Sequence, residues 1–206
     1  MAVAGGFLYL FLRSAQSVRS EPYLIEQQYL APVTLTLQTP VTSTSPMLVL
    51  QPPQQFGSRL FNQVFSRMME SMKGSAADGV PVILGGEYER ALAGRYTPQE
   101  LLEAAQAAGL DSTDFTPVCV AVRRVSEPGL AQQAYFVIFE WPALVEFREQ
   151  VAREIETLPT AGAFDAASLS PVMIIAATDV DFDRWLPISA RAVSDCIAPI
   201  GVLTGS

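Results

Sequence analysis

Residues 117–141 constrain the fold of this chain most, because they have the pattern of two long strands joined by a tight turn. The apolar runs PVCVAVRRV and QQAYFVIFEW flank the turn-forming residues Ser126, Glu127, Pro128 and Gly129. Proline followed by glycine fits the centre of a type II turn, so we expect an antiparallel hairpin. Both alternating sets of side chains on the return strand are apolar, which places that strand inside a sheet rather than at its edge.

The rest of the chain alternates short strands with amphipathic helices. Apolar patterns predict further strands at 34–37, 47–50, 80–84 and 171–177. Apolar spacing and capping signals predict helices at 58–72, 87–93, 97–108 and 142–158. Two hairpins exclude a purely parallel sheet. The expected fold class is therefore α+β, with a mainly antiparallel sheet and helices packed on one face.

The length and composition favour one folded domain behind a short leading segment. Half of the 206 residues are hydrophobic and 17% are charged, which is enough apolar material for a sizeable core. We assign residues 1–20 to an apolar N-terminal arm or anchor and residues 21–206 to a single α+β domain. Within that domain, residues 31–56 are rich in Pro, Thr and Gln and form either a hairpin or a linker.

The N-terminal segment predicts contact with a membrane or a partner. Residues 2–12 are uncharged and mainly apolar, and the expected contact residues are Phe7, Leu8, Leu10, Phe11 and Arg13. The run is too short to span a bilayer by itself, so an anchor, an arm packed on the domain and a cleaved export signal all remain open. For an anchor, Arg13 and Arg19 favour a domain on the cytoplasmic side.

Composition removes several function classes. The chain has no histidine, which excludes catalysis and metal binding by imidazole. Its net charge of −8 is opposite in sign to what phosphate binding requires, so no nucleic-acid partner is expected. The two cysteines, Cys119 and Cys196, are too few for a structural zinc site. Whether they form a disulfide is left open, because the geometry of the bond cannot be read from sequence.

The predicted helix at 58–72 carries a stripe of large, adaptable side chains. Ser58 is placed to cap it and Gly74 to end it. Phenylalanine and methionine recur on one face, and this stripe packs in the core or forms a groove for a partner or an apolar ligand. The groove residues would be Phe61, Phe65, Met68 and Met72.

Two acidic segments are candidates for chemistry. Asp179, Asp181 and Asp183 follow a predicted strand, where α/β enzymes often hold Mg²⁺ or Ca²⁺. The alternative is a solvated turn that leads into the next helix, and the pattern of a calcium loop fails at its sixth and twelfth positions. Glu87 and Glu89 are paired carboxylates after a glycine turn and are weaker candidates for acid–base work.

These observations favour a non-enzymatic interaction or assembly protein without a cofactor, with a membrane-bound protein partner and a membrane-associated location. One alternative is a small hydrolase or transferase that uses Mg²⁺ or Ca²⁺ at Asp179, Asp181 and Asp183. A second alternative is a carrier of an apolar ligand, held by the stripe at 60–72. The location alternative is export after cleavage of the N-terminal segment.

Overall fold

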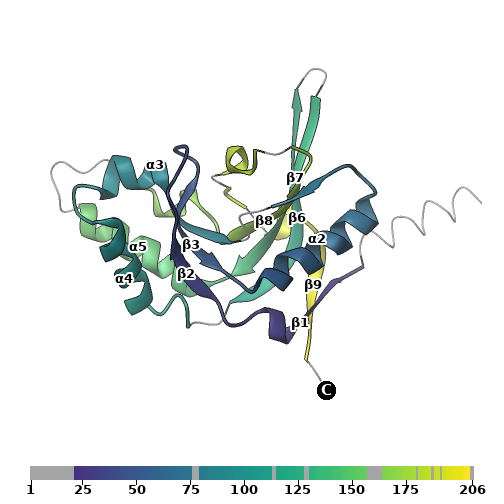
Figure 1. The fold of residues 1–206 in the computed structure, drawn as a ribbon, viewed down its shortest axis with the longest axis horizontal. Coiled ribbons are helices and arrows are strands. Elements are labelled where there is room, and N and C mark those ends of the chain that lie inside the picture. The colour runs from purple at the N-terminus through teal and green to yellow at the C-terminus, as the bar shows by residue number, and fades with distance from the viewer. Residues whose placement is uncertain are drawn as a thin grey trace, which may run out of the picture.

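The computed structural model describes residues 21–75, 79–112, 115–127, 130–156, 164–179, 181–186, 188–190 and 192–204. Its strands form two sheets, and the α+β fold class is confirmed (Figure 1). The six-stranded sheet has the order β1 (Tyr23–Glu26), β9 (Cys196–Leu203), β6 (Thr116–Glu127), β7 (Leu130–Glu140), β8 (Val172–Ala177), β4 (Lys73–Gly74). The three-stranded sheet has the order β2 (Thr34–Leu37), β3 (Pro46–Gln51), β5 (Val80–Leu84).

The predicted long hairpin is the centre of the larger sheet. β6 and β7 pair antiparallel from Thr116↔Glu140 to Glu127↔Leu130, and β7 lies between β6 and β8. The turn residues 128 and 129 fall outside the described residues, so the predicted turn type stays a prediction. As expected from its two apolar faces, β7 contributes to two cores. Tyr135, Val137 and Phe139 belong to one, and Phe136 and Ile138 to the other.

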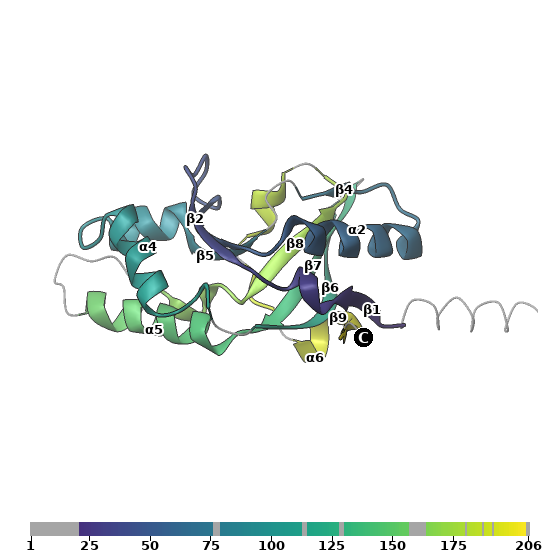
Figure 2. The same ribbon diagram turned by 60° about the horizontal axis from the view of Figure 1, so that its bottom comes forward.

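The three long helices bury side chains in the first of these cores. They are α2 (Gln54–Met68), α4 (Pro98–Ala107) and α5 (Pro142–Glu156). The second core, on the other face of β7, is closed by Trp185, Leu186 and Ile188, which come from η4 (Phe182–Trp185) and the chain just after it. Figure 2 shows α4 and α5 at one end of the molecule and α2 with β1 at the other.

Several predicted elements are confirmed with shifted limits. The strands at 34–37 and 47–50 pair as a hairpin, β2 with β3, and the linker alternative for residues 31–56 is wrong. That hairpin joins β5 in a sheet of its own. The predicted capping box at the start of α4 is present, because Glu100 N–H donates to Thr97 Oγ1 at 3.2 Å and Thr97 N–H donates to Glu100 Oε2 at 2.7 Å.

The helix predicted from Ser58 to Met72 is displaced toward the N-terminus. It begins at Gln54, directly after Pro53, and ends at Met68, because Met69 adopts a left-handed conformation with φ 53°. Met72 therefore lies outside α2, and Gly74 belongs to β4 instead of ending the helix. Prolines suit the first positions of a helix, so the two prolines before Gln54 mark its start better than Ser58 does.

The remaining elements are short or irregular. The predicted helix at 87–93 begins earlier, as α3 (Gly85–Glu87), and continues as the π-helical turn η2 (Tyr88–Leu92). Short helical segments also occur at η1 (Gln27–Tyr29), η3 (Ala166–Ser168) and α6 (Ala192–Asp195). β1, β4 and β9 were not predicted. β9 lacked a clear strand pattern because Pro199 and Gly201 interrupt its alternation.

Candidate interaction surface

α2 presents three different sides: one is buried, one is polar and one is apolar and partly exposed. Its buried side inserts Phe56, Leu60 and Val64 into the core, each with no exposed surface. One flank carries polar side chains four residues apart, and the other carries aromatic and methionine side chains. This division follows from helix geometry, since residues at i and i+4 lie on the same side of a helix.

The polar flank of α2 binds the N-terminal strand of the domain. Gln63 accepts a hydrogen bond from Leu24 N–H at 2.9 Å and donates one to Leu24 O at 2.8 Å. One turn further along, Arg67 donates to the carbonyl oxygens of Glu21 and Pro22, and its guanidinium lies 4.0 Å above the ring of Tyr23. These contacts fix the point at which residues 1–20 join the domain.

Arg59 lies on the same polar flank of α2 and contacts residues at and beyond the C-terminal end of β1. It donates to the hydroxyl of Tyr29 at 2.9 Å and lies 3.9 Å from the carboxylate of Glu26. β1 is an edge strand, and an unpaired edge offers its backbone to other chains. The side chains of α2 therefore occupy the free edge of β1 and leave less of it for strand addition.

The opposite flank of α2 is partly exposed and apolar. We call Phe61, Phe65, Met68 and Met69 the α2 apolar surface. Phe65 is 47% exposed and Met69 is 88% exposed, whereas Phe61 and Met68 are half-buried against the core. The rings of Phe61 and Phe65 stack with their centroids 5.9 Å apart. Phe61 also rests on the backbone of Gly74 in β4, where an added Cβ would lie 3.5 Å from its ring.

Three of the four predicted groove residues therefore lie together, and the fourth does not. Phe61, Phe65 and Met68 are on one flank of α2, but Met72 is buried beyond the end of the helix. Met69, which was not among the predicted groove residues, is instead the most exposed member. Met69 lies four residues after Phe65 and ends the helix with a positive φ.

The predicted N-terminal contact residues lie outside the described part of the chain. They are Phe7, Leu8, Leu10, Phe11 and Arg13, and their roles stay predictions. Across the residues that the structure describes, no helix is both long enough and apolar enough to cross a bilayer.

The three aspartates of the predicted metal site do not converge. Asp183 accepts a hydrogen bond from Ser45 at 2.5 Å, and Asp179 accepts one from the indole of Trp185 at 3.3 Å. Asp179 also lies 3.5 Å from the guanidinium of Arg184, while Asp181 is exposed. Among the described residues, no three acidic, cysteine or histidine side chains are grouped to hold a metal ion. Adjacency in sequence therefore does not bring these carboxylates together.

Glu87, the other acidic candidate, is a buried structural residue. It accepts two hydrogen bonds from Arg148, at 2.7 and 3.2 Å, and its carboxylate also receives Leu84 N–H at 2.9 Å. Arg148 is 1% exposed and Glu87 is 8% exposed. A carboxylate held by a permanent charge partner away from solvent is poorly placed for proton transfer with a substrate.

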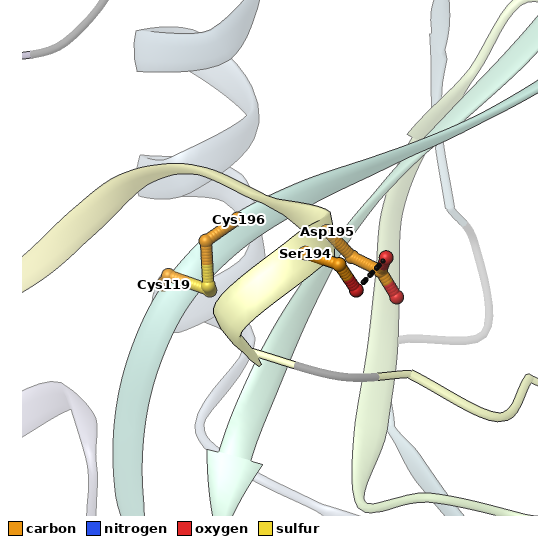
Figure 3. The surroundings of a disulfide bond; sticks show 4 residues. All are labelled: Cys119, Ser194, Asp195 and Cys196. Atoms are coloured by element: carbon orange, nitrogen blue, oxygen red, sulfur yellow. Dashed lines mark hydrogen bonds between the residues drawn. A yellow bond between two sulfur atoms is a disulfide. The ribbon is translucent and has the colours of Figure 1, made fainter.

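The two cysteines of this chain form a disulfide at the second core. Cys119 in β6 and Cys196 at the start of β9 are joined by a disulfide, with their Cα atoms 5.7 Å apart (Figure 3). In Figure 3 the bond lies beside Ser194 and Asp195, the last residues of α6, which are hydrogen bonded to each other at 2.7 Å. The question that the sequence left open is answered by this pairing.

A small hollow bears on the carrier alternative. It is lined by Pro46, Gly79, Ile174 and Phe182, with Asp183 and Leu186 beside them. It has room for about one water molecule, far less than a site for an organic ligand needs. None of its lining residues belongs to α2, the helix predicted to hold an apolar ligand.

No family model, no curated protein and no solved structure matches this chain.

Proposed function

We propose that this chain is a non-enzymatic interaction protein, held at a membrane by residues 1–20, whose α2 apolar surface contacts a membrane-bound protein partner. One observation carries the proposal. Arg67 fixes residues 21 and 22 at the C-terminal end of α2, where Phe65 and Met69 are exposed. The apolar segment therefore joins the domain at the same end of α2 that carries the exposed apolar side chains.

Chain length supports this arrangement. Eight residues lie between residue 12, the end of the apolar run, and residue 21, so the two positions are at most about 30 Å apart along an extended chain. A domain tethered through residues 2–12 therefore keeps the α2 apolar surface close to the bilayer. Exposed apolar side chains in such a place are typical of protein–protein or membrane contacts.

Charge favours a protein over lipid as the occupant of this surface. The chain carries a net charge of −8, and most biological membrane surfaces that attract peripheral proteins are anionic. Phe65 and Met69 are also too few to bind a bilayer without that attraction. A protein partner needs only a complementary apolar patch, which methionine and phenylalanine accommodate well.

The two alternatives have less support from the geometry. For the metal-dependent hydrolase, Asp179 and Asp183 are engaged with Trp185 and Ser45. For the apolar carrier, Phe61 is packed on β4 and Met72 is buried, which leaves a flank and not a groove. The interaction protein is therefore the function that the geometry supports best.

The direct test is photocrosslinking in native membranes. A photoreactive phenylalanine analogue replaces Phe65 in the full chain, and in a second version it replaces Val145, which is 45% exposed on α5 at the far end of the molecule. We expect a discrete crosslinked partner from position 65 and none from position 145. Equal crosslinking from both positions, or none from either, would contradict the proposal.

A substitution pair tests the same surface without a probe. Phe65→Gln is expected to reduce recovery of that partner by about tenfold, which corresponds to loss of one well-packed aromatic contact. Val145→Gln, which replaces an apolar side chain of similar exposed fraction, should leave recovery unchanged. Both positions are half exposed, so neither variant should change the free energy of unfolding by more than about 0.5 kcal/mol.

A further inference from the structure

The disulfide joins two strands of the larger sheet whose backbone pairing is short and irregular. β6 and β9 pair through three residue pairs, Cys119↔Pro199, Val120↔Ala198 and Ala121↔Cys196, with a register shift before the last. Pro199 has no N–H to donate to this ladder. A covalent bond between Cys119 and Cys196 therefore holds β9 to the sheet at a place where backbone pairing is short and irregular.

The same bond secures the edge to which the N-terminal segment is attached. β1 pairs with β9, from Tyr23↔Ile200 to Glu26↔Leu203, and residues 21 and 22 connect residues 1–20 to β1. The order from the centre of the sheet outward is β6, β9, β1. The crosslink thus joins the central hairpin to the strand next to the tether, and it closes a loop of 77 positions.

Two independent features indicate the compartment of the domain. Structural disulfides persist in oxidising compartments and are rare where thiol reductants dominate. The apolar run at residues 2–12 also has the length of the hydrophobic part of an export signal. We infer that residues 1–20 direct the domain across a membrane and that the disulfide forms on the oxidising side.

This inference reverses the orientation that Arg13 and Arg19 favour by charge alone. It does not depend on the α2 apolar surface or on any partner, and it holds whether residues 1–20 remain as an anchor or are removed. Only the first case leaves the tether of the proposed function in place.

The bond-forming step balances as an ordinary dithiol–disulfide exchange. Cys196 is partly exposed and Cys119 is 2% exposed, so the Cys196 thiolate is the better placed to attack the disulfide of a protein thiol oxidase. Cys119 then attacks the mixed disulfide and displaces the oxidase. The two cysteines lose two protons and two electrons, and the oxidase disulfide becomes a dithiol.

The test counts free thiols on the full chain. The full chain is produced in a bacterium with a thiol-oxidising periplasm and in an isogenic strain without the periplasmic thiol oxidase. After acid quenching, the denatured chain reacts with a maleimide–polyethylene glycol reagent, which retards it by one step per free thiol. We expect no step in the first strain and two in the second, since the chain has two cysteines. Two steps in both strains would overturn the inference.

A topology readout and a calibration variant complete the experiment. Protease added to the outside of spheroplasts should digest the domain, whereas a protected domain would place it in the cytoplasm and overturn the inference. Cys119→Ser should give one step in both strains, which calibrates the reagent. If that variant is degraded, the two-strain comparison still stands on the unaltered sequence. If both thiols are oxidised but the photoreactive analogue at position 65 captures no partner, the result counts against the proposed function and leaves this inference intact.

Discussion

Two arginine–carboxylate pairs in this molecule have the same chemistry and very different surroundings. Arg148 and Glu87 approach to 2.7 Å with side chains 1% and 8% exposed, whereas Arg184 and Asp179 lie 3.5 Å apart with side chains 36% and 14% exposed. Both carboxylates were candidates for function from sequence. The comparison shows that burial and the number of partners, not residue type, decide whether such a pair is structural.

The Arg148 network connects three separate segments. Besides Glu87, the guanidinium donates to the carbonyl oxygens of Val82 at 2.8 Å, Ala166 at 2.9 Å and Asp165 at 3.0 Å. Ser168 donates to the same Glu87 carboxylate at 2.9 Å. Such extensive bonding offsets the cost of removing the charges from water, but loss of either partner leaves a buried charge uncompensated.

The largest expected effect comes from breaking this network. Arg148→Met should lower the free energy of unfolding by about 3–5 kcal/mol, because Glu87 and several carbonyl groups lose their donor. Urea unfolding followed by the fluorescence of the buried Trp141 and Trp185 would measure it. Arg153→Met is the matched control. Arg153 lies on the same helix and pairs with Glu149 at 3.8 Å with both side chains more than half exposed, so a change under about 0.5 kcal/mol is expected. Similar losses in both variants would refute the distinction.

A smaller effect is expected at the contact between Ser45 and Asp183. Asp183→Ala should destabilise the chain by about 1–2 kcal/mol, since it removes a hydrogen bond to a charged acceptor that joins the start of β3 to η4. A double-mutant cycle with Ser45→Ala isolates the pair. Addition of Mg²⁺ or Ca²⁺ should leave the cycle unchanged. A metal-dependent gain in stability that Asp183→Ala abolishes would instead support the hydrolase alternative.

A third pair, Tyr96 and Glu154, makes the free energy of unfolding depend on pH. Burial, together with the hydrogen bond that Tyr96 donates to Glu154, raises the pKa of Tyr96 to about 12. A raised folded-state pKa means that this stabilisation is complete below pH 10 and is lost as the pH rises from 10 toward 12. Tyr96→Phe should therefore flatten the alkaline limb of an unfolding-versus-pH curve.

In acid, the contribution of the same pair to the free energy of unfolding depends on pH in the opposite direction. The hydrogen bond from Tyr96 lowers the pKa of the Glu154 carboxyl below its ordinary value of 4.5. The contribution is thus present above that value and is lost as the pH falls through the lowered pKa. Glu154→Gln should weaken the acid dependence. An unchanged pH profile in both variants would show that the contact is not maintained in solution.

The smallest effect is expected at Asp181, the middle aspartate of the predicted metal site. It is exposed, so Asp181→Asn should change the free energy of unfolding by less than about 0.5 kcal/mol. Thermal unfolding with and without millimolar Mg²⁺ would measure this. A stabilising response to metal in the unaltered chain that Asp181→Asn removes would contradict our interpretation of the segment as a solvated turn.

Local sequence signals predicted much of this fold. The capping box at Thr97 and the hairpin at 117–141 were identified because caps and turns depend on neighbouring residues. The two-faced burial of β7 followed from its apolar alternation. The strands β1 and β9 were missed because their pairing joins the two ends of the chain, and no local pattern records a partner about 175 residues away.

The candidate surface was predicted in part for the same reason. The sequence marked Phe61, Phe65 and Met68 by their spacing, but only the tertiary structure removed Met72 to the interior and added Met69. It also decided that α2 holds the start of the domain through Gln63 and Arg67, since nothing in a helical period indicates which strand a polar flank will meet.

The sequence by itself determined the fold class, the main helices and strands, and the exclusion of imidazole chemistry, because these follow from composition and short-range periodicity. The tertiary structure decided which polar groups became structural. It buried the ion pair between Glu87 and Arg148, gave Asp179 and Asp183 different hydrogen-bond partners, and brought Cys119 and Cys196 together across 77 positions. The physical reason is that burial and charge pairing depend on contacts between distant segments, and only the folded chain specifies those contacts.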